Sequence, residues 1–257
     1  MKAALLFGLN YAQCESGELR GCHNDIVNLQ RYLTSQCNYT EEEVKAFNDQ
    51  DHKDQTSAEG ILLTIYNLAK RTLSEDISDC FISYSGHGTQ VRDQGAEEAD
   101  GKDECLVPWD YGTNGIIRDD TIKDVLCQFN PNTRVVFVCD ACHSGSMIDS
   151  RYQYFTNNMG KFEQIEKPIY HSIPCHVIAI SGCRDDQTSA DAHNVNNESK
   201  FTGAFTSCLL QILEDHKDMP IKQLIVDLHQ LLREKGFRQR PVISSSKELN
   251  GDETFIV

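Results

Sequence analysis

Residues 135–145, which read VVFVCDACHSG, contain a short apolar run that ends in a polar cluster and closes on a glycine. Four apolar and mostly β-branched residues in a row predict a strand buried on both faces, as strands inside a parallel sheet are. In open α/β sheets, the functional crevice lies outside the carboxyl ends of the strands. Cys142 stands at such an end and is therefore a candidate nucleophile, whose base is expected to come from another strand end.

A second stretch, residues 79–88 (DCFISYSGHG), meets this expectation because His87 follows an apolar run and stands between Gly86 and Gly88. Glycines on both sides let the backbone turn sharply and leave the imidazole uncovered. A histidine upstream of a cysteine, brought near it only by the fold, is typical of a cysteine–histidine catalytic pair. We predict that His87 acts as general base or acid, forming the thiolate of Cys142 and later protonating the leaving amine.

Simpler roles compete with these. A lone cysteine is by default a buried structural thiol, and a turn histidine is by default a hydrogen-bonded side chain. The polar strand end argues against the first role for Cys142, and the flanking glycines argue against the second for His87. The backbone N–H groups of Gly88 and Cys142 are predicted to form an oxyanion hole, because a turn at a strand end can direct two donors at one point.

Residues 139–143 also spell the C-x-x-C-H pattern of haem attachment. Attachment requires an exported protein with both sulfur atoms accessible, whereas Cys139 closes a predicted buried strand. A zinc site through the same residues would need a second paired cluster, which the sequence does not offer. Both alternatives are disfavoured.

Strand and helix patterns alternate along the chain, which predicts an α/β fold with a mostly parallel sheet covered by helices. Ser57 is predicted to cap a helix that ends near Leu73, and Asn24 or Asp25 to cap one that ends near Ser35. Residues 147–174 lack a clear period and form the best candidate linker. The other predicted strands are 1–10, 44–47, 105–108, 176–181 and 241–244, and the other predicted helices are 119–127, 201–213 and 221–235.

The composition limits the partners and the compartment. The chain has 257 residues, enough for one α/β domain or two small ones. A net charge of −15 argues against nucleic acid or an anionic membrane as partner and favours a basic substrate, a cationic ligand or a metal ion, with a merely soluble acidic surface as the alternative.

Cysteine usage and the N-terminus predict a cytoplasmic location. The 11 cysteines are an odd number and are scattered among apolar residues, which suits free thiols in a reducing compartment. Residues 1–10 are too short an apolar run for a signal peptide and are predicted to be a core strand. No apolar segment has membrane-spanning length, and the sequons at Asn38 and Asn197 are interpreted as chance.

Three motifs, residues 84–88 (YSGHG), 140–145 (DACHSG) and 181–191 (SGCRDDQTSAD), resemble those of metacaspases and occur in the same order. The resemblance implies a caspase-like α/β sandwich with a mostly parallel central sheet and helices on both faces. It implies one peptidase domain over 1–257, with a large-subunit-like part (1–150), a linker (151–173) and a small-subunit-like part (174–257). The sequence has no proline-rich prodomain and only a short linker, so control by removal of a prodomain is not expected.

The resemblance also implies a primary-specificity pocket for arginine or lysine. Asp140 lies two residues before Cys142, and Ser85 two before His87, so each pair shares one face of an extended chain. By resemblance, the pocket adds Cys22 and Asp25 from the first helix. Asp25 is equally compatible with a helix cap.

Asp103, Asp119, Asp120 and Asp149 correspond to the calcium ligands of the family. Carboxylate oxygens suit a hard cation such as calcium, and the spacing of an EF-hand loop is absent. Taken singly, Asp119 and Asp120 can instead favour a helix N-terminus, and Asp149 can belong to the linker surface.

The sequence therefore predicts a monomeric, calcium-dependent cysteine endopeptidase that cleaves protein substrates after arginine or lysine. Self-cleavage is predicted in the linker, at Arg151, Lys161 or Lys167, where regular structure is least expected. One alternative is a catalytically weak, calcium-responsive binding or scaffold module on the same fold, which would not need an intact dyad. Another is a paracaspase-like protease with a different specificity.

Overall fold

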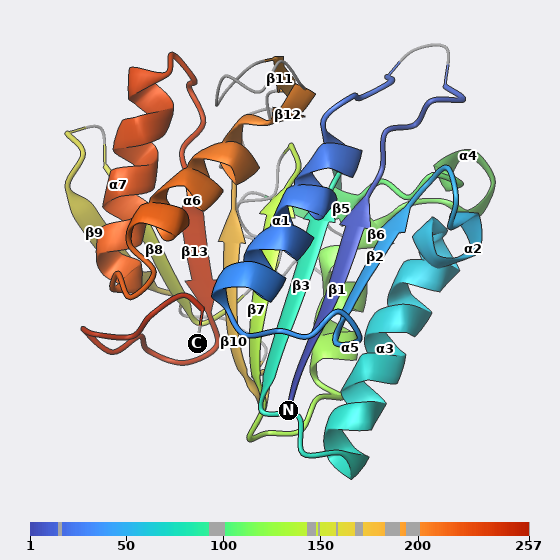
Figure 1. Ribbon diagram of the computed structural model, residues 1–257, viewed down its shortest axis with the longest axis horizontal. Helices are drawn as coiled ribbons and strands as arrows, with labels where there is room; N and C mark the ends of the chain where they lie inside the picture. Colours follow the sequence, from blue (N-terminus) through green and yellow to red (C-terminus); the bar gives the residue numbers. More distant parts are fainter. Residues whose placement is uncertain are drawn as a thin grey trace.

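The computed structural model describes residues 1–14, 17–92, 101–142, 148, 150–157, 159–167, 172–182, 191–193 and 201–256. Figure 1 shows one central sheet with helices in front of it and behind it. Eight strands form this sheet in the order β2-β1-β3-β7-β10-β13-β8-β9. Their bounds are β1 (Lys2–Gly8), β2 (Val44–Asn48), β3 (Asp79–Ser85), β7 (Arg134–Asp140), β8 (Tyr152–Thr156), β9 (Phe162–Glu166), β10 (His176–Ser181) and β13 (Val242–Ser245).

The five strands from β2 to β10 in the sheet order are parallel, and β13, β8 and β9 continue the sheet in antiparallel fashion. Successive side chains of a strand point to opposite faces, so each apolar run supplies two cores. Val136 and Val138 of β7 belong to one hydrophobic cluster, whereas Val135 and Phe137 belong to the other. The predicted mostly parallel sheet, with strands buried on both faces, is confirmed.

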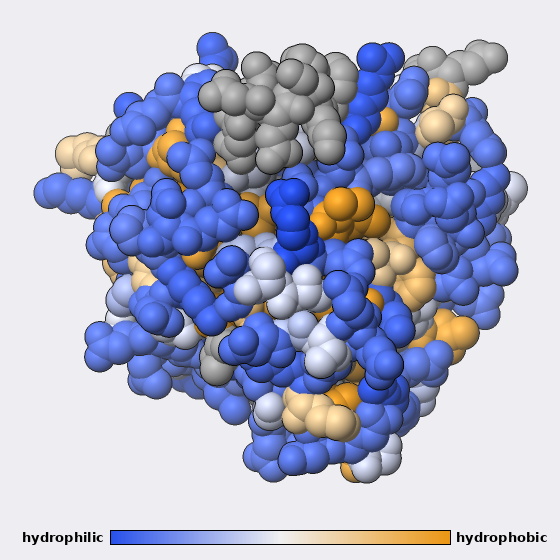
Figure 2. Space-filling model, in the orientation of Figure 1, coloured by the Kyte–Doolittle hydropathy of each residue, from blue (hydrophilic) through white to orange (hydrophobic). Residues whose placement is uncertain are grey.

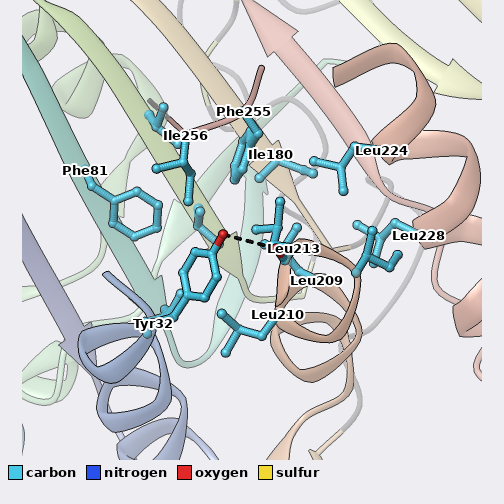
Figure 3. Packing of buried hydrophobic residues seen from close by; sticks show 14 of the residues in the cluster. Tyr32, Phe81, Ile180, Leu209, Leu210, Leu213, Leu224, Leu228, Phe255 and Ile256 are labelled. Atoms are coloured by element: carbon cyan, nitrogen blue, oxygen red, sulfur yellow. Dashed lines mark hydrogen bonds between the residues drawn. The ribbon is translucent and has the colours of Figure 1, made fainter. Parts of the chain in front are cut away.

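Helices α1 (Cys22–Gln36), α6 (Ala204–Asp215) and α7 (Ile221–Glu234) contribute to the first cluster. Helices α3 (Ala58–Ser74) and α5 (Asp119–Leu126) contribute to the second. Figure 3 shows the first cluster, where the hydroxyl of Tyr32 on α1 points toward Leu213 of α6 and donates to its carbonyl oxygen at 3.4 Å. Helices therefore cover both faces, as the sequence predicted.

One of the two predicted helix caps is correct. The hydroxyl of Ser57 accepts a hydrogen bond from the N–H of Gly60 and caps α3. Helix α1 instead begins at Cys22 with Gly21 in the cap position, so the predicted caps Asn24 and Asp25 are wrong. The N–H of Cys22 donates to the Asn10 side chain, 3.0 Å away, and a cap supplied from twelve residues earlier leaves no local signal.

The segment predicted as an irregular linker contains two strands. Strands β8 and β9 form an antiparallel pair within residues 151–173 and extend the central sheet at its edge (Figure 1). Tyr154 and Thr156 of β8 are buried, while the residues of β9 are mostly exposed. The alternation extends over only five residues and contains polar side chains, so it was too weak to indicate a strand from the sequence.

The remaining elements lie outside the central sheet. The predicted helix at 201–213 starts three residues later, because 201–203 pair as a strand. No described helix combines the length and apolarity needed to cross a membrane, and the face drawn in Figure 2 is mainly hydrophilic. The elements outside the central sheet that have not yet been named are two short helices, a three-stranded sheet and a strand pair. The helices are α2 (Lys53–Thr56) and α4 (Tyr111–Asn114). The sheet consists of β4 (Gly88–Arg92), β5 (Lys102–Leu106) and β6 (Ile117–Arg118), and the pair of β11 (Asp191–His193) and β12 (Phe201–Gly203).

Candidate active site

The ends of β3 and β7 bring the two sequence motifs together. The strands are adjacent and parallel, and Ser85 pairs with Asp140 in register. The N–H of Gly86 donates to the carbonyl oxygen of Asp140 at 3.2 Å, so the pairing continues beyond the strand end. His87 and Cys142 each follow two residues after this registered pair. They therefore leave the sheet at the same edge and at the same level.

A steric constraint at Gly88 adds to this proximity. A Cβ atom at Gly88 would overlap with the carbonyl oxygen of Cys142 and press on the Cβ of Ala141. Only glycine lets the two backbones approach this closely. The glycine after the histidine thus brings the turn at His87 against the turn at Cys142.

The imidazole of His87 is held by the backbone. Its Nε2 lies 2.5 Å from the carbonyl oxygen of Gly17. A carbonyl oxygen can only accept, so Nε2 carries a proton and, in the neutral ring, Nδ1 is the basic nitrogen. Gly17 has a φ of +110°, a conformation that favours glycine. The arrangement selects one tautomer of His87 and leaves Nδ1 to exchange a proton.

The two cysteines of the second motif differ in environment. Cys142 is half-buried, as a thiol that meets a substrate must be. Cys139 is 1% exposed and packs in the core on one face of the sheet. Its sulfur is inaccessible, which agrees with the expectation that this pair does not attach haem. His143 lies outside the described residues.

Asp25 and Ser85 meet although they are 60 residues apart. The Ser85 hydroxyl donates to Asp25 Oδ2 at 2.6 Å, and the N–H of Gly203 donates to Asp25 Oδ1 at 2.9 Å. Asp25 is 1% exposed. Its carboxylate therefore faces the β3 end and α6, and it does not cap α1.

Asp140 faces the same place from β7. Its Oδ2 accepts from the N–H of Thr206 at 3.0 Å and from the Thr206 hydroxyl at 2.8 Å. A Cβ at Gly203 would overlap with Asp140 Oδ2 and lie 2.8 Å from Asp25 Oδ2, so Gly203 sits between the two carboxylates. Both carboxylates face the positive N-terminal end of α6, which stabilises buried negative charge.

The structure thus gathers Asp25, Ser85 and Asp140 at one point. Cys22 is buried in the first turn of the same helix as Asp25. Gly203 and Thr206 were missed by the sequence analysis, since neither belongs to the recognised motifs. A glycine followed three residues later by a threonine at a helix start was their only signal.

A second carboxylate cluster lies on β5 and α5. Asp103 on β5 and Asp119 and Asp120 in the first turn of α5 each place an oxygen so that these atoms lie within 4.8 Å of one another. Asp103 and Asp119 are buried and Asp120 is half-buried. Clustered carboxylate oxygens fit a hard cation such as calcium. The fourth predicted ligand, Asp149, lies outside the described residues.

Two internal cations already contact this cluster. Arg118 forms an ion pair with Asp103, and Lys123 Nζ lies 2.6 Å from Asp120 Oδ1. Lys123 is itself buried, with 4% of its surface exposed. A cation that binds here must therefore compete with, or displace, these side chains.

Comparisons with known proteins agree on one family. A family model described as the metacaspase peptidase C14 domain matches residues 2–151. The chain is 31% identical to metacaspase-1 of Eremothecium gossypii over 307 residues, which covers 100% of this chain and 66% of that relative. It is 31% identical to metacaspase-2 of Trypanosoma brucei brucei over 267 residues, with 98% and 75% covered. Metacaspase-1 of Yarrowia lipolytica is 30% identical over 302 residues, with 100% and 64% covered.

The chain thus spans 64% to 75% of the length of these relatives. A crystal structure of a protein from Geobacter sulfurreducens has a TM-score of 0.66 and 21% identity, covering 100% of this chain and 98% of that one, which shows a shared fold. The fold comparison and the family match confirm the predicted caspase-like α/β architecture. With a matching family model over more than half of its residues and relatives aligned along its whole length, the chain belongs to the metacaspase family.

Proposed function

We propose that the chain is a calcium-dependent cysteine endopeptidase that cleaves peptide bonds after arginine or lysine. The observation that carries this proposal is the registered pair of strand ends, which places His87 and Cys142 two residues beyond Ser85 and Asp140. The contact between Gly88 and the Cys142 backbone supports it. Membership in a peptidase family supports the reaction type.

The proposed reaction begins with transfer of the Cys142 thiol proton to Nδ1 of His87. The imidazolium keeps its Nε2–H on the Gly17 carbonyl oxygen, which stabilises the charged ring. The thiolate attacks the scissile carbonyl carbon, and the predicted oxyanion-hole N–H groups of Gly88 and Cys142 donate hydrogen bonds to the developing oxyanion. His87 then protonates the leaving amine, and a water molecule that His87 deprotonates releases the acyl group from Cys142.

The decisive experiment is hydrolysis of matched fluorogenic peptides ending in Arg, Lys, Asp or Gln, with calcium and with excess chelator. The proposal expects turnover of the Arg and Lys peptides only, and only with calcium. Turnover of the Asp peptide would assign a different specificity. Calcium binding without any turnover would support the binding or scaffold module instead.

The calcium part of the proposal is supported by the carboxylate cluster of Asp103, Asp119 and Asp120. Asp103 on β5 and Asp119 and Asp120 in the first turn of α5 would hold a calcium ion, which would supply a divalent positive charge. Three carboxylates this close repel one another unless cations offset them. Arg118 and Lys123 supply part of that compensation in the structure described here.

We therefore predict that Lys123→Met binds calcium more tightly than the wild type, by about tenfold, because the ion no longer competes with a buried ammonium group. Asp119→Ala with Asp120→Ala should abolish binding. Isothermal titration calorimetry measures both, with Lys70→Met, which removes an exposed lysine, as control. Wild-type affinity in Lys123→Met would show that Lys123 does not oppose the ion. Unchanged affinity in the double aspartate variant would remove the cluster from the proposal.

Self-cleavage is proposed in residues 151–173, and the three predicted positions differ in their contacts. Arg151 pairs with Glu166 at 2.6 Å and its carbonyl oxygen accepts from the N–H of Lys167, so both residues close the base of the β8–β9 hairpin. Lys161 is exposed and lies in the turn that joins the strands. A protease needs an extended chain, and a hairpin tip opens at lower free-energy cost than its base.

We expect calcium-treated wild type to be cut after Lys161 before it is cut after Arg151 or Lys167. Lys161→Ala should remove the earliest fragment pair, whereas Lys247→Ala, at another exposed lysine, should not. Intact-mass spectrometry over time reads out the order. Identical fragments from Cys142→Ala would assign the cuts to an outside protease.

A reducing, cytoplasmic location is part of the proposal and is supported by the cysteines. The ten cysteines among the described residues are all free thiols. Burial raises the pKa of four of them to about 12, which keeps them protonated and unreactive. These four are Cys80, Cys105, Cys175 and Cys208.

A further inference from the structure

Two buried tyrosines meet beneath the turn that carries His87. Tyr11 is 3% exposed and Tyr84 is 1% exposed, and their hydroxyl oxygens lie 3.0 Å apart. The backbone N–H of His87 donates to the Tyr11 hydroxyl at 2.9 Å. The Tyr84 hydroxyl lies 3.1 Å from the carbonyl oxygen of the same residue. The His87 backbone is thus contacted on its N–H side and its C=O side by phenol groups.

The available protons define how this contact works. Both hydroxyls also approach the carbonyl oxygen of Val107, Tyr11 at 2.6 Å and Tyr84 at 2.8 Å. Burial raises the pKa of both phenols far above 10, so each keeps its single proton. The Tyr11 hydroxyl donates its hydrogen bond to the carbonyl oxygen of Val107, the shortest of these contacts, and its oxygen accepts from the N–H of His87. Tyr84 then shares its proton between the carbonyl oxygens of Val107 and His87.

The Tyr11 ring also contacts the catalytic side chain. Its centroid lies 4.7 Å from that of the His87 imidazole, with 34° between the planes. The imidazole therefore lies against this ring while its Nε2 is tied to the Gly17 carbonyl oxygen. Tyr11 contacts both the backbone and the ring of His87, so it limits movement of the imidazole.

Tyr11 has an unusual backbone conformation, which hydrogen bonds to Asp49 hold in place. Its φ is +53°, in the left-handed region that non-glycine residues rarely adopt. The Asp49 carboxylate accepts from the N–H groups of Tyr11 at 2.7 Å and Asn10 at 2.9 Å, and its Oδ1 lies 2.6 Å from His23 Nε2. Such strain persists where the surroundings over-determine it, and it concentrates at functional sites.

The charge of Asp49 agrees with this role. Burial alone would raise the pKa of the Asp49 carboxyl, but hydrogen bonds from His23, Asn10 and Tyr11 outweigh burial and lower it. The group is therefore an ionised acceptor at neutral pH. It fixes the backbone on which the Tyr11 side chain stands.

We propose that Tyr11 is a positioning residue for His87, holding the backbone and ring of the histidine so that Nδ1 is directed at Cys142, with Asp49 holding Tyr11 in turn. This inference rests on the proposed peptidase function. The loop after β1, which carries Tyr11, would thus help to position His87, a role that the catalytic motifs alone do not reveal.

The test compares Tyr11→Phe with wild type. The variant keeps the ring and loses the hydroxyl. The N–H of His87 therefore loses its acceptor, and the imidazole is held less firmly in position. We expect kcat to fall about tenfold to hundredfold with KM nearly unchanged. The rate of Cys142 alkylation by iodoacetamide, followed by peptide mass spectrometry, should show its pH midpoint shifted upward, because a misplaced imidazolium stabilises the thiolate less.

Tyr32→Phe is the matched control. Tyr32 is also buried, at 2% exposed, and its hydroxyl donates to the carbonyl oxygen of Leu213, in the core between α1 and α6. The Tyr32→Phe variant should lose about as much thermal stability as Tyr11→Phe, without a change in kcat or in the alkylation profile. If Tyr11→Phe fails to fold, Asp49→Asn is measured in its place, and the same kcat loss and upward shift are expected.

The outcomes are separable. An unchanged kcat and alkylation midpoint in a folded Tyr11→Phe, or in Asp49→Asn, would overturn the positioning role. Equal losses in Tyr32→Phe would overturn it too, because the effect would then be one of stability. The alkylation profile needs no turnover, so it tests the His87–Cys142 geometry even if the proposed peptidase activity fails.

Discussion

Cys142→Ala is expected to abolish peptide cleavage, and His87→Ala to reduce it almost as far. Removing one member of a catalytic unit that acts together lowers kcat by about 10⁴- to 10⁶-fold. The thiol is the proposed nucleophile, and Nδ1 of His87 is the base that the Gly17 contact selects. Both variants should fold, because the close contact at Gly88 involves the Cys142 carbonyl and not its side chain.

The measurement is kcat/KM on an arginine peptide in calcium, with circular dichroism and thermal melting as checks on the fold. Cys127→Ala serves as control, since it removes another half-buried thiol, which follows the last turn of α5. That variant should keep wild-type activity. Retained turnover in purified Cys142→Ala, with contaminating proteases excluded, would refute the nucleophile assignment.

Asp25→Asn is expected to lose cleavage of arginine peptides while the fold survives. Losing one carboxylate partner of a buried, hydrogen-bonded charge commonly costs about 2–5 kcal/mol, and every 1.4 kcal/mol is about tenfold in kcat/KM. A guanidinium can bridge two carboxylates through its planar fork, and an ammonium can bind them as a point charge. An acidic side chain would add a third negative charge to a site where repulsion is poorly screened.

The structure decides which substitution tests this cleanly. Asn at position 25 keeps an oxygen that can accept from Gly203 N–H and an amide that can donate to Ser85. Asp140→Ala would also remove the acceptor of Thr206 and loosen the start of α6. An alanine at Asp25 would disturb the same helix through Gly203, so the asparagine variant isolates the charge.

The measurement is kcat/KM for matched peptides ending in Arg, Lys or Asp. The expected wild-type order is arginine, then lysine, with aspartate excluded. Asp215→Asn, an exposed carboxylate at the opposite end of α6, controls for net charge and should leave the order unchanged. Wild-type arginine selectivity in Asp25→Asn would exclude Asp25 from the specificity pocket.

The sequence determined the features that depend on neighbours along the chain. A short, mostly β-branched apolar run such as residues 135–138 favours a buried strand, and a serine ahead of an amphipathic run, as at Ser57, favours a helix cap. The two motifs could be placed at strand ends because polar residues and glycines interrupt the runs there. The presence of helices on both faces followed from the alternation of strand and helix patterns, and the structure confirms it.

Only the tertiary structure decided contacts between distant segments. Asn10 caps α1, and Gly203 stands between Asp25 and Asp140, because sheet order and helix packing bring these residues together, which no local pattern encodes. The β8–β9 hairpin was missed for a related reason: the polar edge strand β9 is stabilised by pairing with β8, and not by an apolar period of its own. Tyr11 owes its place to Asp49, 38 residues away, so hydrogen bonds that form only after folding set the surroundings of His87.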